Sequence, residues 1–388
     1  MYTFGMAQNF QRFCPTSVRL QLQASKFKPT ILHKSARMTA AGTHPTSVLA
    51  DASAQSLEKP LGSGSGGSPQ AMQERRRPTQ GQLAQAAAFP SPVPLVDIGC
   101  NLVDPSFRSD LPAVLQRARD ANVRALVVTG TCVRTSTAAA HLCESQQRQE
   151  GQGQGRGQGS YPLFFTAGVH PHNAKQCDRS TLEELRRLAA HPRCVAIGEC
   201  GLDFNRNFSP PDVQERWFEE QVLLAKELRR PLFMHCRDAG ERFAEILRRH
   251  SPLPAPAVVH CFTGSGRELE TFLELGLYIG ITGWICDDRP ERGGAELASL
   301  LDSIPRERLM IETDAPYLVP RSIKPSRARP GRNEPSLLPH VLQAAAAAMG
   351  VTPEELGRST TAVACRVFGL PADALGLQPD NPQPGGGK

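Results

Sequence analysis

The chain has 388 residues, of which 40% are hydrophobic, and it carries 44 Lys and Arg against 38 Asp and Glu. No stretch approaches the roughly 18 continuous apolar residues that a membrane-spanning helix requires, so we expect no membrane association. The eleven cysteines include no Cys-x-x-Cys pair, which indicates reduced thiols rather than the disulfide framework of a secreted protein.

The excess of positive charge lies at the N-terminus. Residues 1–50 contain six basic side chains and no acidic one, and the remainder of the chain holds 38 of each sign. A protein that binds DNA through overall positive charge is therefore not expected. Because the segment is rich in Arg, Lys, Ser and Thr and has no long apolar core, we expect residues 1–58 to be a mitochondrial or chloroplast transit peptide. The alternative is a disordered extension of a cytoplasmic protein.

Three further segments have the composition of flexible chain. Gly, Ser, Pro and Gln dominate residues 59–92, which predicts a linker. A run of Gln and Gly at 147–160 predicts a low-complexity insertion, and residues 371–388 predict a disordered tail. A single catalytic domain is therefore expected at 93–370.

Within this domain, short apolar or β-branched runs alternate with segments of helical periodicity. The eight runs lie at 94–99, 124–130, 163–169, 194–199, 231–235, 257–260, 277–281 and 308–314. Eight strand–helix units in about 275 residues match an α/β fold of the TIM (β/α)8 barrel type, although a doubly wound open sheet shows the same alternation. In a barrel, the insertion at 147–160 would lie on the face opposite the active site.

Metal-ligating residue types stand at the ends of four predicted strands: Glu199, His235, His260 and Asp314. A single histidine at such a position is more often an ordinary polar residue than a ligand. Four of them at matching positions favour a closed barrel, which would direct them toward one another across its mouth. Two imidazoles and two carboxylates suit Mg²⁺, our first choice, or Mn²⁺ or Zn²⁺.

A metal ion held in this way can polarise an ester or phosphoryl oxygen and lower the pKa of a bound water. We expect Glu199 to be catalytic as a ligand and Asp314 to accept the proton of that water. A purely structural ligand role for Asp314 stays open at this point.

Basic residues follow the same strands. The loop after the last strand lies where barrels often bind phosphate, and it contains Arg321, Lys324, Arg327, Arg329 and Arg332. A solvated Pro-rich loop explains that segment equally well. The loops that directly follow ligand-bearing strands also supply basic and polar candidates. We expect contacts with a phosphodiester from Arg206, Arg237, His170, His172 and Asn205. The two histidines follow the third strand; simple hydrogen bonding within the loop is the alternative for them, and direct metal coordination is a less favoured one.

Eight motifs occur in order along the domain: DIGCNL, GVHPH, AIGECGLDF, FMHCRDA, HCFTG, YIGITGW, IETDAPYL and RNEP. Together they closely resemble the TatD family of metal-dependent deoxyribonucleases over roughly residues 94–370. The resemblance implies a TIM-barrel metal hydrolase with 3′–5′ exonuclease activity on single-stranded DNA or RNA. By motif, the family's metal ligands fall on Glu199, His235, His260 and Asp314.

The sequence departs from the wider superfamily at its first motif. Many members open with Asp-x-His-x-His, and the matching histidine positions here are Gly99 and Asn101. We therefore expect one well-held ion, with a second recruited only with substrate phosphate. Asp97 and Asn101 become second-layer or weak ligands.

The sequence thus predicts a divalent-metal-dependent nuclease, monomeric by default. A small-molecule amidohydrolase or lactonase on the same barrel is the nearest alternative, since it would share the metal-binding mouth. A non-catalytic binding scaffold is less consistent with four intact ligands.

Overall fold

The computed structural model describes residues 78–151, 161–372 and 375, without the side chains of 149–151. The expected transit peptide, the first part of the expected linker, and most of the expected insertion and tail lie outside these residues. All described residues belong to one compact unit.

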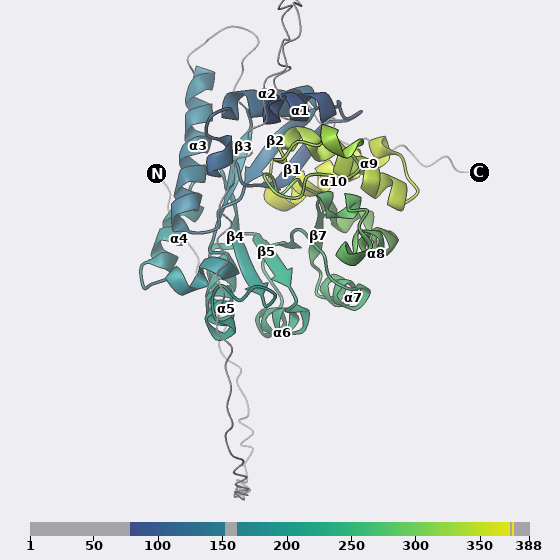
Figure 1. Ribbon diagram of the computed structural model, residues 1–388. Helices are drawn as coiled ribbons and strands as arrows, with labels where there is room; N and C mark the ends of the chain where they lie inside the picture. The colour runs from purple at the N-terminus through teal and green to yellow at the C-terminus, as the bar shows by residue number, and fades with distance from the viewer. Residues whose placement is uncertain (1–77, 152–160, 373–374, 376–388) are drawn as a thin grey trace, which may run out of the picture. The chain divides into compact units, whose positions relative to one another are not determined.

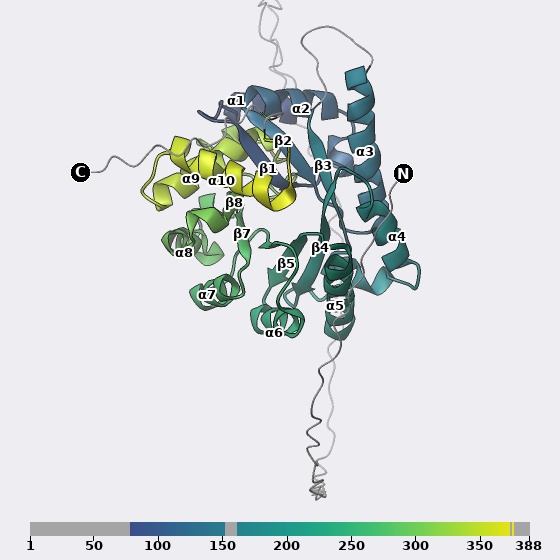
Figure 2. The same ribbon diagram turned by 180° about the vertical axis from the view of Figure 1, so that it is seen from behind.

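Eight parallel strands form one sheet in the order β1 to β8, and the sheet curls into a barrel (Figures 1 and 2). The strands are β1 (Leu95–Cys100), β2 (Val123–Val128), β3 (Leu163–Ala167), β4 (Cys194–Asp203), β5 (Leu232–Arg237), β6 (Ala257–Val259), β7 (Tyr278–Ile281) and β8 (Leu309–Ile311). The predicted barrel is confirmed, and the open sheet was the wrong alternative.

The seam between β8 and β1 is closed just beyond the end of β8. The Asp314 amide donates to the Gly99 carbonyl at 2.8 Å, and the Asn101 amide donates to the Ala315 carbonyl at 2.7 Å. The Asp97 carboxylate accepts from the amide and the hydroxyl of Thr313. Because these bonds tie the segment after β8 to β1, they bring the two ends of the sheet together.

Helices cover the outside of the barrel (Figures 1 and 2). They are α2 (Leu111–Asp120), α3 (Val133–Gly151), α4 (Thr181–Ala189), α5 (Pro211–Leu228), α6 (Gly240–His250), α7 (Gly266–Glu274), α8 (Gly294–Leu300), α9 (Leu338–Ala348) and α10 (Pro353–Phe368). Capping boxes begin α7, with Ser265 and Glu268, and α10, with Thr352 and Glu355; each satisfies free amides of a first turn. Helix α3 extends into the range expected for the insertion at 147–160.

The last helix closes the amino-terminal end of the barrel. The inward side chains of the strands form one buried cluster with residues of α10, including Val96, Phe233, Val258, Met310, Val367 and Phe368. The Thr361 hydroxyl also donates to the carbonyl of Pro94, just before β1. With this end filled, the open end of the barrel is the one where the carboxyl ends of the strands meet.

Part of the expected linker is ordered against the barrel, which corrects the prediction of flexible chain for that part. Helix α1 (Gln80–Ala87) begins with a capping box between Thr79 and Gln82, and Ala84 is fully buried. Phe89 packs edge-to-face on the ring of His340, at 4.8 Å between centroids. The Gly- and Gln-rich composition hid this helix, because its stability comes from packing on the domain rather than from its own sequence.

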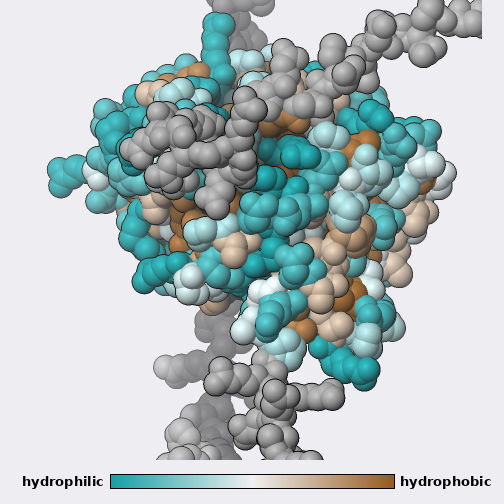
Figure 3. Space-filling model, turned by 90° about the horizontal axis from the view of Figure 1, so that it is seen from above, coloured by the Kyte–Doolittle hydropathy of each residue, from teal (hydrophilic) through white to brown (hydrophobic). Residues whose placement is uncertain are grey.

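No helix in the described ranges is long and apolar enough to cross a membrane. The face shown in Figure 3 is largely hydrophilic, with hydrophobic residues in smaller areas between the polar ones.

Candidate active site and metal centre

Glu199 lies in the middle of β4 because the strand continues four residues beyond it, to Asp203. The pairing of β4 with β5 shifts register between Gly198 and Cys200. Gly198 and Gly201 have φ of 146° and 135°, and a Cβ at either would collide with a carbonyl of β5. Only glycine allows this backbone and this close approach, so the Gly-Glu-Cys-Gly sequence sets the position of the carboxylate.

Three imidazole rings surround one oxygen of this carboxylate. The Glu199 Oε1 atom lies 2.8 Å from His260 Nε2, 3.2 Å from His170 Nε2 and 3.3 Å from His235 Nδ1. His170 follows β3, His235 is on β5 and His260 directly follows β6. Burial opposes ionisation of Glu199, but His170 and His260 outweigh it and hold the pKa of the carboxyl well below its usual range. We call these four residues the Glu199 cluster.

The cluster fits a divalent cation. His170, Glu199 and His235 each offer one ligand atom, and these atoms all lie within 4.8 Å of one another. Burial lowers the pKa of His170 to about 4, so its ring is neutral at physiological pH, the form that binds metals. For His170 the sequence favoured a substrate contact over direct coordination, and in the structure its ring is among the candidate ligands. His260 contacts the same Glu199 oxygen at 2.8 Å, so its ring also lies beside the candidate metal site.

Asp314 lies three residues beyond β8, with a left-handed φ of 51°. Its Oδ1 accepts from the side-chain amide of Asn101, Nδ2, at 3.1 Å. Burial raises its pKa to about 7, partly offset by His260, while Glu199 adds to the increase. A carboxyl with this pKa can accept and release a proton near neutral pH. Asp97 instead holds the neighbouring Thr313 in the barrel seam, so it orients the segment of Asp314 rather than reaching the cluster.

Two buried carboxylates that the sequence analysis did not select hold the far sides of the imidazoles. Asp203 Oδ2 lies 3.3 Å from His235 Nε2 and 2.8 Å from His172 Nε2. Glu312 Oε1 lies 3.4 Å from His260 Nδ1 and accepts from the Cys261 amide at 2.5 Å. Carboxylates in this position fix the orientation and tautomer of metal-binding histidines. In the sequence, the signal for these two residues was the acidic side chains within the ECGLD and IETD segments.

Glu312 also gives a reason for the glycine at position 99. A Cβ at Gly99 would overlap the Glu312 Oε2 atom, so the glutamate occupies the space that a side chain at 99 would need. The carboxylate of Glu312, the residue after β8, therefore fills the volume that a side chain at position 99 would occupy.

The expected phosphate-binding residues lie either around the Glu199 cluster or on the basic loop at 321–332. Around the cluster, Arg206 and Asn205 are exposed, and Asn205 donates to Asp238 at 2.6 Å. Arg237 is half-buried, with its guanidinium 5.8 Å from the centre of the Trp284 ring. His172 is held by Asp203.

Three basic side chains of the loop at 321–332 form ion pairs with acidic residues, which favours a structural role for this loop over phosphate binding. Arg321 and Lys324 pair with Asp288 at 2.8 and 2.5 Å. Arg332 pairs with Asp110 at 2.8 Å. These partners come from distant parts of the chain, so the loop's composition alone overstated its free charge.

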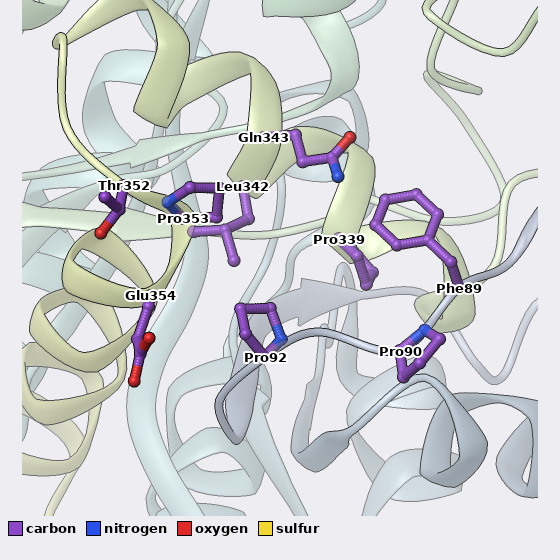
Figure 4. Close-up of a pocket in the computed structure, with 9 residues that line it drawn as sticks. All are labelled: Phe89, Pro90, Pro92, Pro339, Leu342, Gln343, Thr352, Pro353 and Glu354. Atoms are coloured by element: carbon purple, nitrogen blue, oxygen red, sulfur yellow. The ribbon is translucent and has the colours of Figure 1, made fainter.

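A separate cavity of about 340 Å³ lies between the segment before β1 and the α9–α10 pair (Figure 4). Phe89, Pro90 and Pro92 face Pro339, Leu342 and Pro353 across it. Its walls carry Glu354 as their one ionisable side chain, so we assign it no part in catalysis.

A parallel eight-stranded barrel with imidazoles and carboxylates converging at the carboxyl ends of its strands defines a metal-dependent hydrolase. Comparison with known proteins gives the family. The family described as TatD related DNase matches residues 96–369, and the chain belongs to it.

Sequence relatives and solved structures agree with this assignment. The protein named 3′-5′ ssDNA/RNA exonuclease TatD from Erwinia billingiae is 48% identical over 278 residues, which cover 72% of this chain and all of that protein. A hydrolase TatD family protein from Entamoeba histolytica matches with a TM-score of 0.63 and 25% identity, over 73% of this chain and 100% of that one. The TatD homolog YJJV from Escherichia coli gives 0.62 and 28%, over 71% and 98%.

Proposed function

We propose that this protein is a divalent-metal-dependent nuclease that hydrolyses phosphodiester bonds, acting as a 3′–5′ exonuclease on single-stranded DNA or RNA. The observation that carries the proposal is the Glu199 cluster, with three imidazoles around one buried carboxylate at the open end of the barrel. The names of relatives that this chain covers completely support the direction of digestion and the single-stranded substrate.

Glu199, His170 and His235 would hold the ion, with His260 and Asp314 beside them. We propose Mg²⁺, with Mn²⁺ and Zn²⁺ also compatible with the donor set. When bound, such an ion supplies Lewis-acid polarisation of the phosphoryl group and makes water a stronger nucleophile.

Side chains of the protein itself accept the proton, hold the phosphodiester and orient the imidazoles. Asp314, held by Asn101, accepts the proton of the attacking water, because its pKa of about 7 makes it a base of suitable strength. Arg206 and Arg237 hold the phosphodiester, since a guanidinium matches two phosphate oxygens at once. Asp203 and Glu312 keep His235 and His260 in the orientation that points their nitrogens at Glu199.

Digestion of end-labelled oligonucleotides tests the proposal. With a 5′ label, a ladder that shortens from the 3′ end and vanishes with EDTA is expected, with a matched duplex digested more slowly. DNA and RNA of one sequence compare the two sugars. Hydrolysis of small lactones or cyclic amides, with no digestion of either nucleic acid under any divalent ion, would support the amidohydrolase alternative instead.

Two further proposals concern the whole chain. Residues 1–58 direct the protein to a mitochondrion or chloroplast; fusion of this segment to a fluorescent protein should place the fluorescence in one of these organelles, and diffuse cytoplasmic fluorescence would contradict it. The protein is a monomer, for which light scattering in solution should give one chain mass of 42.1 kDa, or less after removal of the N-terminal segment.

A further inference from the structure

Three large hydrophobic side chains in the described ranges are strongly exposed: Phe208 at 55%, Tyr317 at 56% and Leu223 at 45%. Isolated apolar side chains are common on protein surfaces and by themselves indicate nothing. The position of the two aromatic rings is different. Phe208 follows β4 and Tyr317 follows β8, so both lie on loops at the open end of the barrel, whereas Leu223 lies on helix α5.

Phe208 is held in place while its ring stays exposed. Its ring packs edge-to-face on that of His172, with 4.7 Å between centroids and 72° between planes. His172 in turn bonds Asp203, which contacts the cluster through His235. The aromatic ring is therefore anchored three contacts from the candidate metal ligand His235, with more than half of its surface open to solvent.

Tyr317 lies on the segment that follows β8, three residues after Asp314. Its amide donates to the Asp314 carbonyl at 3.0 Å. Tyr317 therefore comes from the same segment as Asp314, and more than half of its side chain is open to solvent.

Exposed aromatic rings beside arginines are the means by which proteins hold single-stranded nucleic acid, because every base has a face that stacks. We propose that Phe208 and Tyr317 are base-stacking residues that hold the terminal nucleotides of a single strand over the Glu199 cluster. The inference rests on the proposed nuclease function. It supplies a physical reason for single-strand preference, since the bases at a duplex end are already stacked and paired.

Binding of a fluorescent oligonucleotide tests the assignment separately from catalysis. The full chain is titrated, with the divalent ion present, into single-stranded DNA whose 3′-terminal linkages are phosphorothioates that resist hydrolysis. Phe208→Ala and Tyr317→Ala are each expected to weaken binding by about 5- to 150-fold, the range for loss of one stacked base. Phe208→Trp and Tyr317→Phe keep a ring and should bind like the wild type, and Leu223→Ala is the matched exposed control.

A second probe identifies the bases as the partner of the rings. An oligonucleotide with abasic residues at its 3′ end should bind the wild type more weakly, and the alanine variants should no longer distinguish it from the intact strand. In digestion, the loss should fall on KM, with kcat changed by less than a few-fold.

The outcomes separate this inference from the proposed function. If the wild type binds and digests the strand, but the alanine variants bind both oligonucleotides as it does, the stacking role is overturned and the nuclease stands. If the wild type neither binds nor digests any single strand, both fail together.

Discussion

The buried ion pair between Arg117 of α2 and Glu334, after β8, allows a quantitative test of the fold around the site. Arg117 Nε and Nη2 lie 2.6 and 2.8 Å from the two oxygens of Glu334, whose side chain is fully buried. Among the described residues, the Glu334 carboxylate keeps Ser336 and the more distant Arg332 Nη2, at 3.3 Å, when Arg117 is removed. Truncation therefore leaves a buried carboxylate mostly unpaired.

Breaking a buried pair costs about 3–5 kcal/mol, and we expect Arg117→Ala to lie near the lower end because Arg332 remains. Arg186→Ala is the matched control. Arg186 meets Glu227 with the same two-bond geometry, at 2.9 and 2.8 Å, but these side chains are 37% and 54% exposed. Its loss should cost much less, because solvent screens an exposed pair.

Denaturant-induced unfolding, followed by the fluorescence of Trp217 and Trp284, measures both free energies of unfolding. The double variant Arg117→Met/Glu334→Met should recover part of the loss, because no unpaired charge stays buried. Equal and small losses for Arg117→Ala and Arg186→Ala would refute the reasoning, since burial would then make no difference to the pair.

Three further predictions concern the site and the core. Glu312→Gln should weaken metal binding or digestion by about 10- to 100-fold, as expected for a carboxylate that orients a ligand such as His260; calorimetric metal titration measures it, and an unchanged affinity would exclude the orienting role. In the metal-free protein, carboxylate neighbours raise the pKa of His235 and His260 above the usual value. At a given pH a larger fraction of these rings than of free imidazole is therefore protonated, and a cation must displace those protons. Metal affinity should increase from pH 6 to pH 8 with proton release; an affinity that fell with rising pH would contradict the sign. Phe368→Ala should lower the free energy of unfolding by about 3–5 kcal/mol with digestion per folded molecule unchanged, and a loss below about 1 kcal/mol would show that α10 does not fill the barrel end.

The periodic alternation of apolar runs was enough to predict all eight strands, because each is buried on both faces and reads as a continuous hydrophobic segment. The strand ends likewise indicated that Glu199, His235 and His260 would meet. Closure of the barrel brings these neighbouring strands together, although Glu199 lies in the middle of β4 and not at its end as expected.

What the sequence could not show depends on contacts made across the chain. Asp203 was missed because β4 was expected to end at Glu199, whereas two glycines with positive φ carry it onward. A substrate contact was favoured for His170, since the sequence does not show that the loop after β3 brings its ring beside Glu199. The basic loop at 321–332 gave no sign that its charges would be paired, since Asp110 and Asp288 lie far away in sequence.

The central claim is that the Glu199 cluster supplies the divalent ion for phosphodiester hydrolysis. Its most direct test is the rate of digestion of a 5′-labelled single strand as Mg²⁺ or Mn²⁺ is titrated into metal-free protein, for the wild type and for Glu199→Gln. We predict no digestion without metal, saturable activation of the wild type, and at least about a 100-fold lower rate for the variant at the same metal concentration. Equal activation of the two proteins, with both folded, would place the reaction elsewhere and contradict the account.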